Sequence, residues 1–121
     1  MRNLLIRLII NAVALYVATQ IVPGLKFEGD WTTIAIVAFI FGLVNALVRP
    51  VLTLLTCPLL VLTLGLFTFV INALMLALTG WLAEQLRLGF IVKDFWAAFL
   101  GALVITIVSF LLTLLLGEER D

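Results

Sequence analysis

Charged residues divide the sequence into four apolar stretches, which run over residues 8–22, 31–48, 51–83 and 95–117. A helix that crosses a bilayer needs about 20 apolar residues, and about 17 to 25 are tolerated. The second and fourth stretches meet this length directly. The first stretch reaches this length when Asn3 to Arg7 are added as a turn at headgroup level. The side chain of Arg7 then extends so that its charged group reaches the membrane surface.

The third stretch is too long for one helix and too short for two complete crossings. It holds 33 uncharged residues, which as one helix would extend about 50 Å against roughly 30 Å of hydrocarbon. Pro58 and the step from Thr63 to Gly65 favour helix breaks. We therefore expect a short re-entrant or interfacial helix over residues 51–64, shielded by its neighbours, and a third complete span from residue 66. A fifth crossing by the short segment is the alternative.

A loose internal repeat relates the two halves of the chain. The matching residues are Asn11-Ala12 and Asn72-Ala73, Leu25-x-Phe27 and Leu88-x-Phe90, and Asp30-Trp31 and Asp94-Phe95. The repeat predicts two copies of a helical hairpin joined by residues 49–65. It also argues against a cleaved signal peptide at the N-terminus, because cleavage would destroy one copy.

These patterns predict an all-α integral membrane protein with a single transmembrane domain over residues 1–121. The four transmembrane helices, expected in two tandem hairpins, run over residues 4–22, 31–48, 66–83 and 95–117, with the short helix at 51–64. An even number of spans places both termini on one side. That side carries Arg2, Arg7, Arg49 and Arg120, against Lys26, Arg87 and Lys93 on the other. The positive-inside rule then predicts that both termini are cytoplasmic.

Composition supports the membrane assignment and excludes several classes of protein. Apolar residues make up 65% of the chain and charged residues 12%, whereas a soluble domain is about half apolar and about a quarter charged. Because a chain this small leaves much of its surface exposed, the bilayer must cover the remainder. A soluble enzyme, a nucleic-acid-binding protein and a secreted disulfide scaffold are excluded. Seven basic and seven acidic residues also create no net field for nucleic acid.

The sequence lacks the side chains that most catalytic sites require. It contains no histidine, and its single cysteine, Cys57, is expected to be a small buried hydrophobe. No nucleophile–base pair, phosphate loop or metal cluster is recognisable, and no carboxylate lies inside a span. We therefore expect no enzymatic activity and no cofactor.

Small and polar residues recur at helical spacing on the predicted spans. The candidates for helix packing or for a lumen are Asn11, Gly42, Asn45, Asn72, Gly80 and Gly101. Small residues let helix backbones approach, and side-chain amides form hydrogen bonds between helices. These faces therefore form the helix–helix core of a bundle. The alternative is a water-filled lumen in an oligomer, lined by the three asparagines.

Arg49 is the only charge between Trp31 and Glu84. One interpretation is an anchor at the cytoplasmic interface. The other is a functional intramembrane charge, partnered by Glu118, by Glu119 or by a lipid phosphate. Helix breaks are expected at Pro50, Pro58 and Gly65.

Part of this pattern resembles a known family. The residues that carry the resemblance are Gly42-Leu-Val-Asn45-Ala-Leu-Val-Arg49-Pro50, Pro58, Thr63-Leu-Gly65-Leu-Phe67, Asn72-Ala73, Pro23-Gly24-Leu25 and Asp94-Phe-Trp-Ala. They are similar to the four-transmembrane phage holins of superfamily IV. The resemblance covers nearly the whole chain and implies a multi-pass protein of the bacterial plasma membrane, as a homo-oligomer or within a membrane-protein complex. It implies no catalytic residue.

Two functions remain open at this point. The first is a non-enzymatic structural or membrane-integrity role, within a larger membrane assembly. The alternative is a holin-like oligomeric pore whose protomers associate through the small-residue faces. In both cases the lipid bilayer is a partner and nucleic acid is not.

Overall fold

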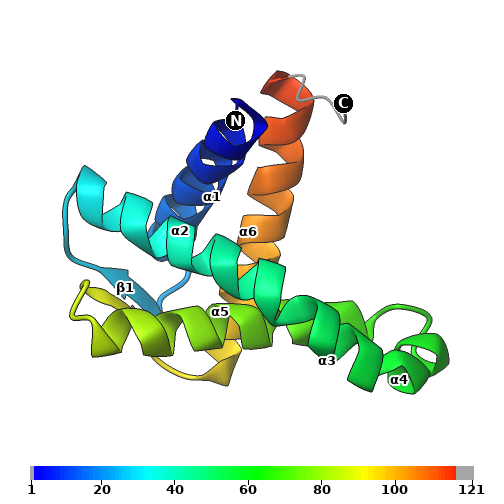
Figure 1. Cartoon of the computed structure of the whole chain (residues 1–121). Coiled ribbons are helices and arrows are strands. Elements are labelled where there is room, and N and C mark those ends of the chain that lie inside the picture. Colours follow the sequence, from blue (N-terminus) through cyan, green and yellow to red (C-terminus); the bar gives the residue numbers. More distant parts are fainter. Residues whose placement is uncertain (1, 117–121) are drawn as a thin grey trace.

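The chain folds into six helices and two short strands over the residues that the structure, a computed structural model, describes (Figure 1). The described residues are 2–116, with side chains from residue 4. The elements are α1 (Arg2–Ile21), β1 (Leu25–Phe27), α2 (Trp31–Leu47), α3 (Arg49–Leu55), α4 (Cys57–Leu62), α5 (Phe67–Gln85), β2 (Phe90–Val92) and α6 (Phe95–Leu116).

Four helical segments are long and apolar enough to cross a membrane, which confirms the predicted four-span, all-α architecture. They are Leu4–Ile21, Trp31–Leu55, Phe67–Gln85 and Phe95–Leu116. The second segment contains both α2 and α3, so it extends beyond the predicted end at residue 48. The two strands, of three residues each, were not predicted.

The two strands join the loops of the two hairpins. They pair antiparallel, with Leu25 opposite Val92 and Phe27 opposite Phe90. The backbone hydrogen bond from Glu28 N to Gly89 O, 2.9 Å long, continues the pairing. Because the loops meet, both hairpins have their loops at the same end of the molecule. If α3 and α4 crossed the membrane as a fifth span, the loop between α5 and α6 would lie at the opposite end from the loop between α1 and α2. The five-span alternative therefore does not hold.

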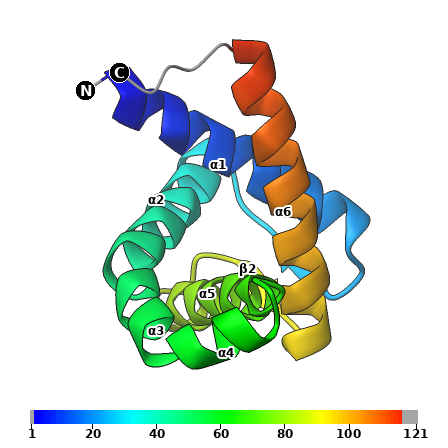
Figure 2. The ribbon, with the colours of Figure 1, turned by 90° about the vertical axis from the view of Figure 1, so that its right-hand side faces the viewer.

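The four long helices form two crossing pairs. α1 packs against α2 and α6, and α5 packs against α2 and α6, so the contacts form a closed ring. In Figure 1, α1 and α6 stand side by side, and α2 and α5 run across them. Figure 2 shows how the pairs diverge away from the strands. The helices therefore pack most closely near the strands and separate toward the end that holds the start of α1.

Small residues fill the core where the helices cross. The buried alanines and glycines are Ala14, Ala18, Ala38, Ala73, Gly80, Ala83, Ala97, Ala98, Gly101 and Ala102. A Cβ at Gly101 would lie 2.5 Å from Leu25 Cδ1 and 2.8 Å from Leu76 Cδ2, both of them buried side chains. The absence of a side chain at Gly101 therefore lets α6 approach α5 and β1.

Both of the helices that follow a strand begin with an aspartate cap. Asp30 Oδ1 accepts hydrogen bonds from the N–H and the hydroxyl of Thr33, each 3.0 Å long. Asp94 Oδ1 accepts a hydrogen bond of 2.8 Å from the N–H of Ala97. Such caps satisfy N–H groups that have no partner inside the helix. The two aspartates occupy equivalent positions of the repeat, one residue before α2 and α6.

The segment between the hairpins differs from the prediction of one helix over residues 51–64. It contains two short helices, α3 and α4, each with proline as its second residue. Proline is tolerated in the first turn of a helix, where its missing N–H is not needed. Hydrogen bonds from Val48 N to Val44 O and from Leu52 N to Val48 O therefore continue α2 into α3 with little interruption.

The turn from α4 to α5 uses left-handed backbone. Leu64 has a φ of 57° and Gly65 a φ of 90°, and glycine adopts such a conformation without strain. The hydroxyl of Thr63 accepts a hydrogen bond of 3.1 Å from Phe67 N, the first N–H group of α5. Cys57 is exposed on α4. The expectation that it is buried was wrong, because α4 has no fully buried residue and contacts the core only through side chains such as Leu60.

Candidate functional site

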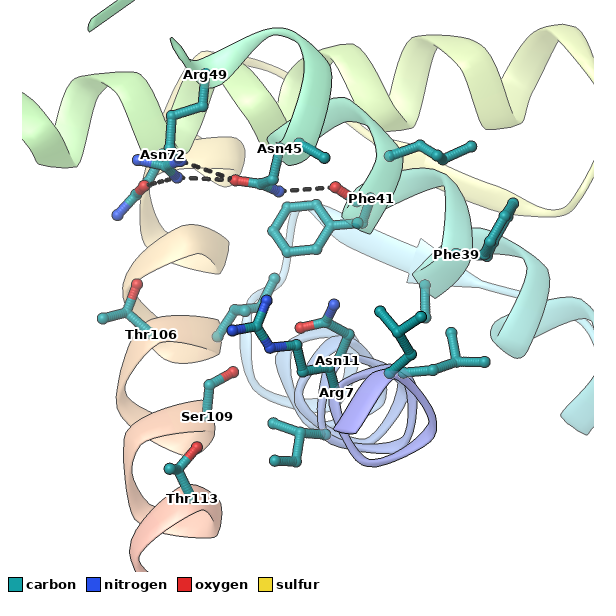
Figure 3. A pocket seen from close by; sticks show the side chains of 18 of the residues that line it. Arg7, Asn11, Phe39, Phe41, Asn45, Arg49, Asn72, Thr106, Ser109 and Thr113 are labelled. Carbon is teal, nitrogen blue, oxygen red and sulfur yellow. Dashed lines mark hydrogen bonds between the residues drawn. The ribbon is translucent and has the colours of Figure 1, made fainter. Parts of the chain in front are cut away.

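A cavity of about 830 Å³ lies between the two helix pairs. Its polar lining residues are Arg7, Asn11, Asn45, Arg49, Asn72, Thr106, Ser109 and Thr113 (Figure 3). The other lining residues are apolar side chains and Gly42, and no described Asp or Glu lines it. The cavity therefore combines two cationic side chains with neutral hydrogen-bonding groups.

The polar residues lie in the half of the molecule away from the strands. Arg7 belongs to the second turn of α1, and Asn72 to the second turn of α5. Thr113 lies in the last turn of α6, and Arg49 is the first residue of α3. The cavity thus lies toward the end of the molecule where α1 begins and α6 ends.

A network of hydrogen bonds fixes Arg49 at the wall of the cavity. Asn45 Nδ2 donates to the carbonyl oxygen of Phe41 over 2.7 Å, which turns Asn45 Oδ1 toward the guanidinium group. That oxygen accepts from Arg49 Nε at 3.1 Å and from Nη2 at 2.9 Å. Arg49 Nη2 also donates to Asn72 Oδ1 (Figure 3). Arg49 therefore links the junction of α2 and α3 to α5.

The partners of Arg49 in the described part of the chain are neutral. A guanidinium group carries five N–H donors, and these hydrogen bonds occupy Nε and Nη2. The described residues offer no acceptor to Nη1. Glu118 and Glu119, which the sequence offered as partners, lie outside the described residues. The amides hold the group in place but do not neutralise its charge.

Helices α1 and α6 provide the remaining polar lining. Figure 3 shows Arg7 and Asn11 extending into the cavity from α1. The hydroxyl groups of Thr106, Ser109 and Thr113 lie along α6 across from them. These side chains supply hydrogen-bond donors that surround the same space as Arg49.

The walls of the cavity follow the internal repeat. Five lining residues of α2 and α3 correspond to residues of α6 that lie 64 positions later and also line the cavity. The pairs are Ala38 and Ala102, Phe41 and Ile105, Gly42 and Thr106, Asn45 and Ser109, and Arg49 and Thr113. The cavity therefore lies between the two copies of the hairpin. The charge of Arg49 breaks this symmetry, because its counterpart is the neutral Thr113.

The structure separates the residues singled out from the sequence into three groups. Asn11, Gly42, Asn45, Arg49 and Asn72 line the cavity. Two others, Gly80 and Gly101, pack against β2 and against the core instead. The three expected breaks lie at the start of α3, at the start of α4 and in the turn before α5.

Two lining residues, Thr106 and Thr113, were missed by the sequence analysis. The signal that could have identified them is the repeat, because each lies 64 positions after a candidate, Gly42 or Arg49. Within residues 2–116, no three His, Cys, Asp or Glu side chains come together as a possible metal site.

Comparison with known proteins supports the resemblance seen in the sequence. Residues 2–111 match the family described as "Mycobacterial 4 TMS phage holin, superfamily IV". The uncharacterized protein SCO3922 of Streptomyces coelicolor is 48% identical over 98% of each chain. The uncharacterized membrane protein YvlD of Bacillus subtilis is 33% identical over 62% of each chain. No solved structure matches the chain.

Proposed function

We propose, from the premise that this chain belongs to the mycobacterial four-transmembrane phage holin family of superfamily IV, that it has a non-enzymatic, structural role in the bacterial plasma membrane. In this role it supports membrane integrity as one component of a larger membrane assembly. The observation that carries the proposal is the burial of its small-residue faces inside a single chain.

The small-residue faces are the surfaces through which copies of a holin-like protein would associate. Ala14 and Ala18 of α1, Ala38 of α2 and Ala98 of α6 are completely buried within this chain. These surfaces are therefore already used by the helices of one protomer. Oligomerisation through the same faces would require the protomer to come apart.

The packing near the strands also favours a structural role. Leu15, Leu25, Leu76 and Phe90 are buried side by side in the core on the strand side of the cavity. Large apolar side chains in this position separate the polar cavity from the loop end of the molecule. Such an arrangement supports a protein that does not conduct ions through one chain.

The orientation with both termini in the cytoplasm forms part of the proposal. Arg7 and Arg49 lie in the half that contains the N-terminus of α1, whereas the loop end carries Glu28, Asp30 and Asp94 beside its basic residues. The positive-inside rule counts lysine and arginine only, and the sequence has four of them flanking the spans on the side of the chain termini (Arg2, Arg7, Arg49 and Arg120) against three on the loop side (Lys26, Arg87 and Lys93).

The second candidate is a holin-like pore. The observation that favours it is the polar cavity itself, which Asn11, Asn45 and Asn72 line together. A pore would require several protomers to join their cavities into one aqueous path. In each protomer, the apolar core between the cavity and the strands would also have to separate so that water could pass.

Leakage from vesicles distinguishes the two candidates. The purified chain is reconstituted into liposomes that contain a small fluorescent dye, with protein-free liposomes and liposomes treated with a pore-forming peptide as controls. We expect dye release equal to that of the protein-free vesicles, and an undisturbed membrane potential in cells that express the chain strongly. Dye release that grows with the amount of protein would reject the structural role and favour the pore.

Isolation from membranes in a mild detergent tests the assembly. The structural role predicts that a tagged chain isolates together with another membrane protein in a fixed ratio. Recovery of the chain only as a monomer or as a homo-oligomer would contradict that part of the proposal.

A further inference from the structure

We propose that the cavity binds the phosphate group of an anionic lipid, with the guanidinium group of Arg49 as its main contact. This inference goes beyond the structural role, since a pore-forming protein could bind a lipid in the same place, and its assignment to the inner leaflet rests on the proposed orientation. The argument rests on the charge of the cavity, on the way Arg49 is held, and on the apolar part of the lining.

The charge of the cavity selects an anion. Two arginines line it, and no described Asp or Glu does. A cationic side chain at membrane depth is destabilised unless it finds a partner or reaches water. The amide oxygens around Arg49 are neutral acceptors, so a negative ligand would add the charge compensation that they lack.

The hydrogen bonds of Arg49 prepare it for such a ligand. Asn45 and Asn72 occupy Nε and Nη2 and come from two different helices, so the planar group is fixed before any ligand arrives. Nη1 keeps both of its N–H groups available, because the described residues offer it no acceptor. Guanidinium groups form strong, charge-assisted hydrogen bonds with phosphate oxygens. The fixed geometry lowers the entropy lost on binding.

Neutral donors on the opposite walls complete the polar half of the site. Asn11 on α1 and the hydroxyl groups of Ser109 and Thr113 on α6 line the same cavity as Arg49. A phosphate group has more acceptor positions than one guanidinium group can occupy. The glycerol hydroxyls of a lipid head group can use the remaining amide and hydroxyl groups.

The apolar lining identifies the ligand as a lipid and not as free phosphate. Leu4, Leu5 and Phe39 line the cavity, and each of these side chains is more than half exposed. In a membrane these side chains contact acyl chains, so they connect the polar site to the surrounding lipid. The volume of about 830 Å³ lies in the range of roughly 300–1,000 Å³ that is typical of ligand sites. It exceeds the space that one phosphate ion needs.

The location of the cavity fits the same ligand. It lies between transmembrane helices in the half of the molecule that contains the start of α1. Basic pockets between transmembrane helices on the cytoplasmic side are known binding places for anionic head groups. A lipid of the inner leaflet can therefore enter laterally between the diverging helix pairs.

Native mass spectrometry of the full chain in detergent provides the test. Phosphatidylglycerol is titrated against the protein, and phosphatidylcholine with the same acyl chains serves as the zwitterionic reference. We expect tighter binding of phosphatidylglycerol. Arg49→Gln is expected to weaken that binding at least about tenfold, which is the scale of losing a charge-assisted hydrogen bond. Lys26→Gln removes one positive charge at the loop end and should leave the affinity within about twofold.

A second pair of variants leaves Arg49 and its amide partners unchanged. Ser109→Phe fills the cavity from α6, and Ile107→Phe places the same side chain on the exposed side of that helix. We expect at least about a tenfold loss of affinity for phosphatidylglycerol in the first variant and less than about a twofold loss in the second. Circular dichroism and the elution volume in size-exclusion chromatography establish that each variant is folded. This pair keeps the test decisive even if Arg49→Gln does not fold.

Three results would overturn the proposal. The first is equal affinity for phosphatidylglycerol and phosphatidylcholine in the unaltered chain. The second is an unchanged affinity for phosphatidylglycerol in folded Arg49→Gln or in folded Ser109→Phe. The third concerns the source of the phosphate: if inorganic phosphate or glycerol 1-phosphate displaces the lipid at equal concentration, the site binds a soluble anion and not a lipid.

Discussion

At the scale of single residues, the role of a glycine or an asparagine in this chain depends on whether it lies in the packed core or at the cavity. Gly101 and Gly80 allow close packing, because a Cβ at either position would lie 2.5 Å from a neighbouring side chain. Gly42 borders the cavity instead, where a Cβ would lie 3.7 Å from Asn11 Nδ2, an ordinary contact. Asn72 holds Arg49, whereas Asn11 faces the cavity from α1. Substitutions at matched positions separate these contributions.

Gly101→Ala is expected to destabilise the fold, and Gly42→Ala is not. The added methyl group at position 101 must displace Leu25 or Leu76, and both side chains are buried in the core. Overpacking of this kind lowers the free energy of unfolding by about 1–3 kcal/mol. At position 42 the methyl group points into the cavity, and alanine favours the helix by about 1 kcal/mol. Thermal unfolding in detergent measures both variants, and equal stability of the two would contradict this account.

Asn72→Ala is expected to destabilise the fold more than Asn11→Ala. The first substitution removes a hydrogen-bond acceptor from the charged group of Arg49, and such bonds contribute about 1.5–3 kcal/mol. The second substitution removes a side chain for which the structure gives no hydrogen bond within the described residues. The same unfolding assay compares them. A larger loss for Asn11→Ala would show that Arg49 is not held as described.

At the scale of elements, the helices were predictable and the contacts between their loops were not. Charge-free stretches of suitable length identify spanning helices because the bilayer imposes that length. The strands around Leu25 and Phe90 have three residues each, too few for an alternating pattern, and they form only because the two loops meet. The short helices α3 and α4 follow the prolines, but Pro50 interrupts α2 less than expected, since it stands in the first turn of α3.

Acidic pH is expected to weaken the start of α2. Hydrogen bonds from the N–H and the hydroxyl of Thr33 lower the pKa of Asp30 below the ordinary value of an aspartate. A carboxyl group whose pKa is lower in the folded chain stabilises the fold above its unfolded pKa, and the contribution is lost as the pH falls through its folded pKa. Asp30→Asn keeps an acceptor for the cap but does not titrate in this range.

Thermal unfolding of the unaltered chain and of Asp30→Asn between about pH 6 and about pH 2.5 tests this cap. The difference in stability between the two should shrink as the pH falls below about 4. A difference that stays constant over this range would mean that Asp30 makes no contribution through its charge.

At the scale of the whole molecule, the crossing of the helix pairs decides what the polar faces become. Helical spacing in the sequence placed Asn11, Asn45, Arg49 and Asn72 on inward faces, and all four line one cavity. The cavity itself could not be predicted, because it depends on the angle between two helix pairs, α1 with α6 and α2 with α5. That angle depends on contacts such as those of Gly101 with both hairpins. The periodicity of a single helix carries no information about that angle.

The common direction of the two hairpins leads to a prediction about the topology of the chain. The pairing of β1 with β2 places both loops at one end, so the turn from α4 to α5 lies away from the loops, at the far end of α5, as the start of α1 lies at the far end of α1 (Figure 1). Leu64, in this turn, is 92% exposed, and Glu28 is exposed beside β1. With Cys57 replaced by serine, Leu64→Cys and Glu28→Cys provide one labelling site at each end.

A membrane-impermeant maleimide is applied to intact spheroplasts and to inverted vesicles that carry these variants. We expect Glu28→Cys to react in spheroplasts and Leu64→Cys to react in inverted vesicles, because an even number of spans with cytoplasmic termini puts the loops outside and the α4–α5 turn inside. The reverse labelling pattern would agree with the fold but would mean that the termini lie outside the cytoplasm. Reaction of both variants from the same side would contradict the paired-hairpin fold, since no arrangement with β1 beside β2 places the two sites on one face of the membrane.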